Sequence, residues 1–203
     1  ALRTRGAATA QGWAASLTMG AGQFCTNPGL AILIEGADSA AFVAAVTEAL
    51  KGVAGQTTVT AGIAAAYREG VRRLRDAPGV VEELSTACEH RTASPNLFVT
   101  SGKQWLDNAA LGEEVFGPAG LVVKVADFDE MLTVASALEG QLTCTLHMDT
   151  ADTAQVRRLL PVLERKAGRI LANGFPTGVE VCDTMVHGGP YPASTNFGAT
   201  SVG

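Results

Sequence analysis

The second half of the chain alternates strand-like and helix-like segments, and this alternation limits the possible folds more than any other feature. Residues 121–125 form an apolar run typical of a strand, and Asp127 is suited to the first position of a helix. A strand pattern at 142–148, a helix pattern at about 152–166 and a strand pattern at 169–173 follow. Strands that alternate with helices run parallel, because each crossover returns the chain to the same edge. The sequence therefore predicts an α/β fold with a mainly parallel sheet flanked by helices.

The first half carries the same two kinds of segment. Helix patterns cover residues 6–19 and 38–50, with Asp38 as the expected cap, and a third helix is expected after Thr60. Residues 30–34 are almost uniformly apolar, which is typical of a strand buried on both faces. Less regular strand patterns occur at residues 80–84 and 97–100.

Composition excludes several classes of protein. The chain has 203 residues, of which 47% are hydrophobic and 17% charged, as expected of a folded domain. Its net charge of −5 argues against a basic groove for nucleic acid. Its apolar runs are far shorter than the ~20 residues of a membrane span. The four cysteines lie far apart, so we expect reduced thiols and a cytoplasmic location; they are Cys25, Cys88, Cys144 and Cys182.

Cys25 is the first candidate for chemistry. It lies in a loop, residues 20–29, whose glycines and proline favour tight turns between a helix and a strand. A thiolate attacks carbonyl carbon well, and backbone amides of such a turn can stabilise the resulting oxyanion. An inert buried thiol is about equally compatible with these residues alone. A cysteine hydrolase would need a histidine partner, and the candidates are His90, His147 and His187.

A metal site is the remaining candidate. Cys144 and His147 have a C-x-x-H spacing, but on a strand their side chains point to opposite faces. A zinc site needs about four ligands, and the sequence offers no second pair. We therefore expect no metal.

Two motifs together resemble the aldehyde dehydrogenase superfamily. Residues 22–26, Gly-Gln-Phe-Cys-Thr, resemble its active-site cysteine signature. Residues 113–118, Glu-Glu-Val-Phe-Gly-Pro, resemble its second signature, and the order and spacing are those usual for the family. The resemblance continues through residues 138–142 to the strand that ends at Asn173, so it covers nearly the whole chain.

The resemblance implies three roles. Cys25 is the nucleophile, Glu114 accepts hydrogen bonds from the nicotinamide ribose of NAD or NADP, and Phe116 packs beside the nicotinamide. These residue types suit the roles, because a carboxylate binds a diol and an aromatic ring holds a planar heterocycle. Without the cysteine signature, a surface carboxylate and a core phenylalanine would be the better interpretation.

Within the superfamily, residues 22–29 and 187–192 resemble the members that oxidise 2-oxoglutarate semialdehyde. Phe24, Thr26 and His187 are then expected to line the substrate pocket, although His187 is also suited to ordering its loop. Oxidation of another small or medium aldehyde, and a catalytically silent module of the same fold, are the alternatives.

The resemblance also implies that parts of the enzyme lie elsewhere. Family members carry a Rossmann domain before this region, and their general-base glutamate and oxyanion asparagine precede the cysteine. No G-x-G-x-x-G motif follows a strand here. We expect residues 1–203 to be the catalytic domain of a longer chain, with that chain's Rossmann domain as partner. The isolated domain should not turn over aldehyde, and the full-length enzyme should form homo-oligomers.

Overall fold

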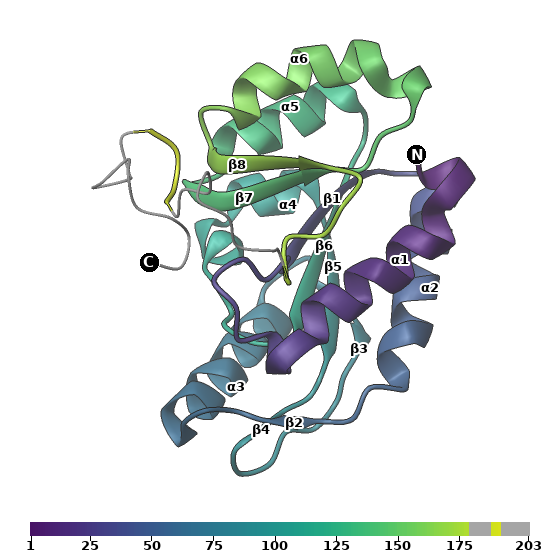
Figure 1. Ribbon diagram of the computed structural model, residues 1–203. Coiled ribbons are helices and arrows are strands. Elements are labelled where there is room, and N and C mark those ends of the chain that lie inside the picture. Colours follow the sequence, from purple (N-terminus) through teal and green to yellow (C-terminus); the bar gives the residue numbers. More distant parts are fainter. Residues whose placement is uncertain (179–187, 192–203) are drawn as a thin grey trace.

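The structure is a computed structural model that describes residues 1–178 and 188–191. Its elements alternate between helices and strands through most of the chain (Figure 1). In chain order they are α1 (Leu2–Thr18), η1 (Met19–Gly22), β1 (Leu30–Ile34), α2 (Ala37–Lys51), β2 (Gln56–Thr57), α3 (Ala61–Asp76), β3 (Val81–Leu84), β4 (Thr92–Ala93), β5 (Asn96–Ser101), α4 (Gly102–Asp107), η2 (Ala109–Gly112), β6 (Ala119–Val125), α5 (Phe128–Ala137), β7 (Gln141–Leu146), η3 (Thr150–Asp152), α6 (Thr153–Leu163) and β8 (Ala167–Ala172).

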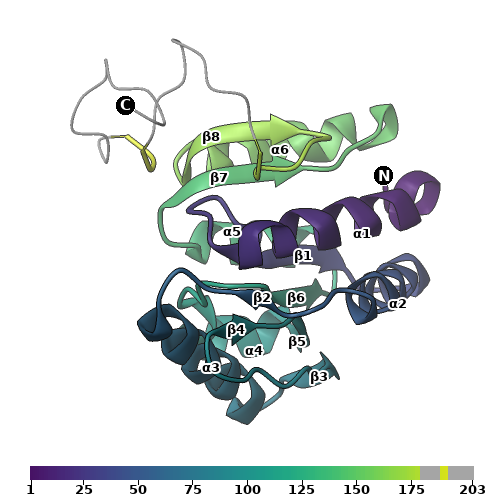
Figure 2. The same ribbon diagram turned by 60° about the horizontal axis from the view of Figure 1, so that its bottom comes forward.

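The main sheet has the strand order β1-β6-β5-β3. β1, β6 and β5 are parallel, while β3 is antiparallel to β5. β7 and β8 form a separate parallel pair, which Figure 2 shows on the β1 side of the main sheet. β2 and β4 form a short antiparallel ribbon. The expected mainly parallel sheet flanked by helices is confirmed.

Helices cover both faces of the main sheet. α1 and α2 pack on one face, where the Trp13 and Phe42 rings lie 5.9 Å apart. α3, α4 and α5 pack on the other face around the fully buried Tyr67 and Phe98. α5 and α6 together cover the β7–β8 pair. Among the helices of the described residues, none has both the length and the apolar character that a bilayer crossing requires.

Two details of the sequence prediction are wrong. β1 is an edge strand with residues 30–33 only half-buried, and β6 takes the central, buried position. An apolar strand can be covered by helices as well as by neighbouring strands. Its composition therefore does not show whether it is paired with a strand on both edges. Asp38 lies inside the first turn of α2, and Gly36 is its N-cap.

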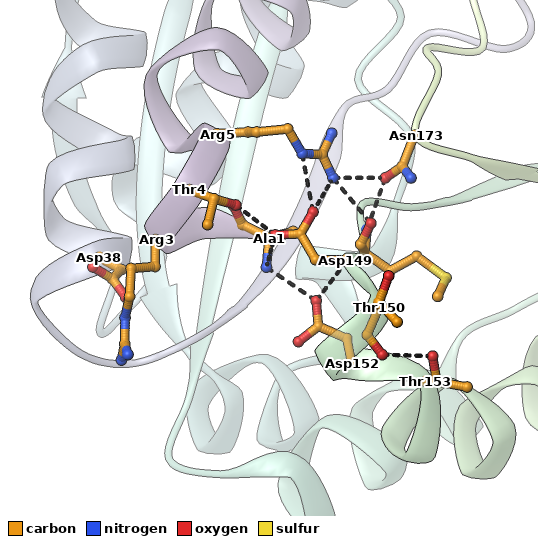
Figure 3. Close-up of polar contacts among 11 residues, drawn as sticks. Ala1, Arg3, Thr4, Arg5, Asp38, Asp149, Thr150, Asp152, Thr153 and Asn173 are labelled. Atoms are coloured by element: carbon orange, nitrogen blue, oxygen red, sulfur yellow. Dashed lines mark hydrogen bonds and ion pairs between the residues drawn. The ribbon is translucent and has the colours of Figure 1, made fainter.

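A polar cluster connects the start of α1 to the ends of β7 and β8 (Figure 3). The Arg5 guanidinium donates to the Met148 carbonyl at 2.9 Å, to the Asp149 carboxylate at 2.9 Å and to the Asn173 side chain at 3.0 Å. The Thr4 hydroxyl and Arg5 lower the pKa of the Asp149 carboxyl to about 2. The cluster therefore fixes where the chain leaves β8.

From Asn173 the chain returns along α1, and we call residues 173–178 the return segment. Phe175 lies directly on α1, since a β-carbon added at Gly12 would be 2.3 Å from its ring. Further along, the Thr177 hydroxyl donates to the Ser16 carbonyl at 3.0 Å. The return segment thus runs from the Arg5 cluster toward the loop that holds Cys25.

Candidate active site

The loop that carries Cys25, residues 20–29, begins with an unusual backbone conformation. Gly20, Ala21 and Gly22 have φ values of 56°, 58° and 65°, in the left-handed region that favours glycine. A turn follows, closed by a hydrogen bond of 3.0 Å from the Asn27 amide to the Phe24 carbonyl. Cys25 lies within this turn and is exposed. We call residues 20–29 the cysteine loop.

Side chains tie the cysteine loop to the end of α1. The Asn27 side chain donates to the Leu17 carbonyl at 2.8 Å. The Gln56 amide group makes two bonds: it donates to the Thr18 carbonyl at 3.0 Å and accepts from the Ala21 amide at 2.9 Å. The last carbonyls of a helix have no partner within the helix, so these contacts satisfy them and fix the path of the loop. Sequence reasoning missed Gln56, because no motif marks it.

The cysteine loop also contacts the return segment. The Thr26 hydroxyl donates to the Pro176 carbonyl at 3.1 Å. Phe24 is 37% exposed at the surface of the same loop. Within the described residues, the backbone amides of Cys25 and Thr26 donate to no protein acceptor. They are therefore available to an oxyanion formed beside the sulfur.

The second sequence motif forms another loop, residues 113–118, which we call the glutamate loop. Glu114 is exposed and Phe116 is half-buried. Behind them the loop packs on α3: a β-carbon at Gly117 would lie 2.3 Å from the Tyr67 ring, and one at Gly70 would lie 2.8 Å from Val115. Burial raises the pKa of the Tyr67 hydroxyl, which donates to the Ser94 carbonyl at 2.6 Å.

The two loops touch through their backbones. A β-carbon added at Gly22 would lie 2.4 Å from the Gly117 carbonyl carbon and 2.6 Å from the Pro118 nitrogen. Cys25, Glu114 and Phe116 line one open cavity of about 1870 Å³. The structure therefore brings the two sequence motifs together, with the thiol, the carboxylate and the ring on one cavity.

Cys25 differs from the other described thiols. Cys88 and Cys144 are half-buried, and burial raises the pKa of Cys144. Cys182 lies outside the described residues. The alternative of a buried thiol at position 25 is therefore wrong.

Neither described histidine assists Cys25. His90 lies in the loop before β4, and His147 packs against Phe175 with tilted rings whose centroids are 5.0 Å apart. Neither forms a hydrogen bond with the sulfur, so the part of the chain that is described holds no cysteine–histidine pair at Cys25. His187, expected to line the substrate pocket, lies outside the described residues. Nor do residues 1–178 and 188–191 contain a group of three or more metal-ligating side chains.

Comparison with known proteins identifies the family. Residues 6–194 match the model of the aldehyde dehydrogenase family. The chain is 51% identical to alpha-ketoglutaric semialdehyde dehydrogenase 2 of Azospirillum brasilense and 42% identical to alpha-ketoglutaric semialdehyde dehydrogenase of Acinetobacter baylyi. Each match covers 100% of this chain and 39% of the relative, so the chain spans about two fifths of the length of these curated relatives.

Solved structures agree on the fold. Aldehyde dehydrogenase 21 from Physcomitrella patens, in complex with succinate, matches 90% of this chain and 38% of its own with a TM-score of 0.74 at 17% identity. Glyceraldehyde-3-phosphate dehydrogenase GapN from Methanocaldococcus jannaschii, complexed with NADP, matches 89% of this chain and 39% of its own with a TM-score of 0.72 at 18% identity. The motifs, the fold and the family match agree, and the chain belongs to the aldehyde dehydrogenase family.

Proposed function

We propose that this chain is the thiol-bearing catalytic domain of an enzyme that oxidises an aldehyde to a carboxylic acid with NAD⁺ or NADP⁺. The observation that carries the proposal is the contact between Gly22 and Gly117, which holds the exposed Cys25 and the Glu114 carboxylate on one cavity. A nucleophile and a cofactor-binding group must share a site if a hydride is to leave the carbon bound to sulfur.

Cys25 performs the covalent chemistry. Its thiolate adds to the aldehyde carbon, a carbon–sulfur bond forms, and the carbonyl oxygen takes the negative charge beside the amides of Cys25 and Thr26. A bound NAD⁺ or NADP⁺ would accept the hydride that leaves the same carbon, and a thioester then remains on the sulfur. Water then attacks the thioester carbon, the carbon–sulfur bond breaks, and the acid departs. The resemblance to the family implies that a glutamate outside residues 1–203 activates this water.

Glu114 and Phe116 suit the nicotinamide end of the cofactor, whose bound form supplies the hydride acceptor. The Glu114 carboxylate is exposed on the cavity, and within the described residues its oxygens have neither a hydrogen-bond nor an ion-pair partner. Both oxygens are therefore available to the two hydroxyls of a ribose. Phe116 presents a half-buried ring on the same cavity, against which a planar heterocycle can pack. The choice between NAD⁺ and NADP⁺ depends on a 2′-site outside this chain.

The proposed substrate is 2-oxoglutarate semialdehyde. The names of the two curated relatives support it, since they match the whole chain at 51% and 42% identity. Phe24 precedes Cys25 in the cysteine loop and has an exposed ring, and it is proposed to contact the substrate, as is His187. Thr26 is proposed to act in the same pocket, with its hydroxyl donated to Pro176.

The full-length enzyme tests the function. Purified protein should reduce NAD⁺ or NADP⁺ with 2-oxoglutarate semialdehyde at a higher kcat/KM than with acetaldehyde, hexanal or benzaldehyde. Cys25→Ser should lower kcat by several powers of ten, because it removes the covalent route. A better aliphatic or aromatic substrate would contradict the semialdehyde assignment alone. No turnover of any aldehyde, with Cys25 no more reactive toward iodoacetamide than Cys88 or Cys144, would favour a silent module.

The isolated chain gives a second test. The chain spans 39% of the length of its curated relatives, and the resemblance implies that the general base and most of the cofactor site lie outside residues 1–203, so we expect no steady-state NADH formation above a Cys25→Ser control. Turnover above that control would contradict the proposed division of the enzyme. The cytoplasmic location, the Rossmann partner domain and homo-oligomers of the full-length enzyme remain predictions.

A further inference from the structure

One face of α3 supports the glutamate loop from behind. Tyr67, Gly70 and Arg73 are spaced three residues apart and therefore lie on the same side of the helix. Tyr67 packs on Gly117, and Gly70 leaves space for Val115. Arg73 makes the polar contacts of this face. Its guanidinium lies 3.1 Å from the Glu113 carboxylate and 3.5 Å from the Glu114 carbonyl oxygen.

Arg73 is well placed to set the direction of the loop. Its side chain is 30% exposed, and its Nε atom is buried without a hydrogen-bond partner among the described residues. The rest of the guanidinium contacts the side chain of one glutamate and the backbone of the next. Glu113 has an extended backbone, with φ −70° and ψ 137°. Successive side chains of such a segment point in different directions, about a third of a turn apart, so a Glu113 carboxylate held against α3 turns Glu114 to another side of the loop.

The same contact separates two adjacent carboxylates. Glu113 and Glu114 would repel each other, and both would be suited to a ribose diol if both were free. Arg73 pairs with Glu113, while the described residues provide no such partner for Glu114. We propose that Arg73 is a positioning residue: it occupies Glu113 and orients the glutamate loop so that the Glu114 carboxylate is the one presented to the cofactor. This inference rests on the proposed function and assigns a role to a residue outside both motifs.

The chain offers a matched control on the same helix. Arg72 is the neighbouring arginine, and its ion pairs are with Glu69 and Asp76, both also on α3. Arg72→Ala removes an arginine of the same helix without touching the glutamate loop. Arg73→Lys keeps the charge but not the planar group that reaches two acceptors at once, so it should restore only part of the function.

The first measurement is hydrogen exchange of the full-length enzyme without ligands. In Arg73→Ala, the amides of residues 113–116 should exchange faster than in the wild type, whereas those of residues 20–29 should not change. Arg72→Ala should leave both regions unchanged. Equal exchange of residues 113–116 in the two variants would overturn the proposal, and this readout does not depend on which reaction the enzyme catalyses.

The second measurement is the affinity for NAD⁺ and NADP⁺, by calorimetric titration, with steady-state kinetics beside it. Arg73→Ala should weaken binding of the preferred cofactor about threefold to fivefold, the size expected for a partly exposed ion pair. The KM for aldehyde and the alkylation rate of Cys25 should stay at wild-type values. Equal losses of cofactor and aldehyde affinity, with a lower unfolding temperature, would mean a general structural role and overturn the inference. A wild-type enzyme that binds neither cofactor would instead overturn the proposed function.

Discussion

The cysteine loop and the glutamate loop meet at one point but are held in different ways. The cysteine loop depends on left-handed backbone at Gly20, Ala21 and Gly22 and on side chains that satisfy the end of α1. The glutamate loop depends on packing against α3 and on the partly exposed Arg73–Glu113 pair. Backbone conformation and buried hydrogen bonds are insensitive to salt, whereas an exposed ion pair is weakened by it. We therefore expect the position of the Cys25 thiol to be insensitive to salt and that of the Glu114 carboxylate to depend on it.

The largest effect on stability and activity is expected from a substitution at the contact between the two loops. We expect Gly22→Ala to destabilise the protein by about 2–5 kcal/mol, from left-handed strain and from overlap with Gly117 and Pro118. Because the overlap is with backbone, no rotamer change relieves it, and the thiol and the carboxylate must move apart. Urea unfolding and kcat/KM of the full-length enzyme measure the two effects.

Gly29→Ala is the matched control for that prediction. It adds the same methyl group to the same loop, but the nearest atom would be the Ala119 carbonyl oxygen at 3.5 Å, an ordinary contact. We expect stability and kcat/KM close to those of the wild type. If Gly22→Ala behaved like Gly29→Ala, the two loops would not constrain each other.

The glutamate loop should respond more weakly, because side chains rather than backbone hold it. In Gly70→Ala the new methyl group would lie 2.8 Å from one Val115 methyl and 3.0 Å from the other. We expect the free energy of unfolding to fall by about 1 kcal/mol. Steric overlap costs about 1–3 kcal/mol, and the higher helix propensity of alanine offsets about 1 kcal/mol of that cost. Displacement of Val115 should also weaken cofactor binding in Gly70→Ala, and adding Val115→Ala should restore it, as calorimetric titration of the single and double variants would measure.

Gly62→Ala is the matched control for Gly70→Ala. Gly62 is on the same helix, and its nearest contact for a new methyl group is the Thr60 hydroxyl oxygen at 3.7 Å. Only the propensity gain operates there, so stability should rise by about 0.5–1 kcal/mol with unchanged cofactor affinity. A loss at Gly62, or no rescue by Val115→Ala, would mean that α3 does not support the loop through this contact.

The same contrast explains what could be predicted from the sequence. The elements are local, so periodicity and residue type predicted most of the helices and strands. The glycine-rich loop drew attention to Cys25, whereas the role of Glu114 came from the resemblance of its motif to the family signature and stays a proposal. The position of β1 depends on pairing partners far along the chain, and its apolar side chains are compatible with an edge strand against helices. Gln56 and Arg73 act on loops that precede or follow them by many residues, and neither belongs to a motif. Their roles follow only from how the helices pack.

The smallest expected effect is a pH dependence of stability. It should affect the return segment and the cysteine loop but not the glutamate loop. His147 packs against Phe175 of the return segment, whose Pro176 accepts the hydrogen bond from Thr26 in the cysteine loop. Burial, and secondarily the charge of Arg5, lowers the pKa of His147. Because the pKa of His147 is lower in the folded protein, the histidine of the unfolded chain takes up a proton first as the pH decreases. Stability is therefore full above about pH 6.5, the usual pKa of histidine, and falls as the pH decreases below it.

We thus expect a slightly lower unfolding midpoint at pH 5.5 than at pH 7.5, and faster hydrogen exchange in residues 173–178, with residues 113–118 unaffected. The Arg5 guanidinium faces His147 from α1, and its charge favours the neutral imidazole. Asp149 pairs with Arg5, and its pKa of about 2 keeps its carboxylate charged between pH 5.5 and 7.5. His147→Phe keeps an aromatic ring against Phe175 and removes the titrating group, so its midpoint should not show this decrease. A decrease that persists in His147→Phe, or one that also loosens residues 113–118, would show that the supports of the two loops are not independent.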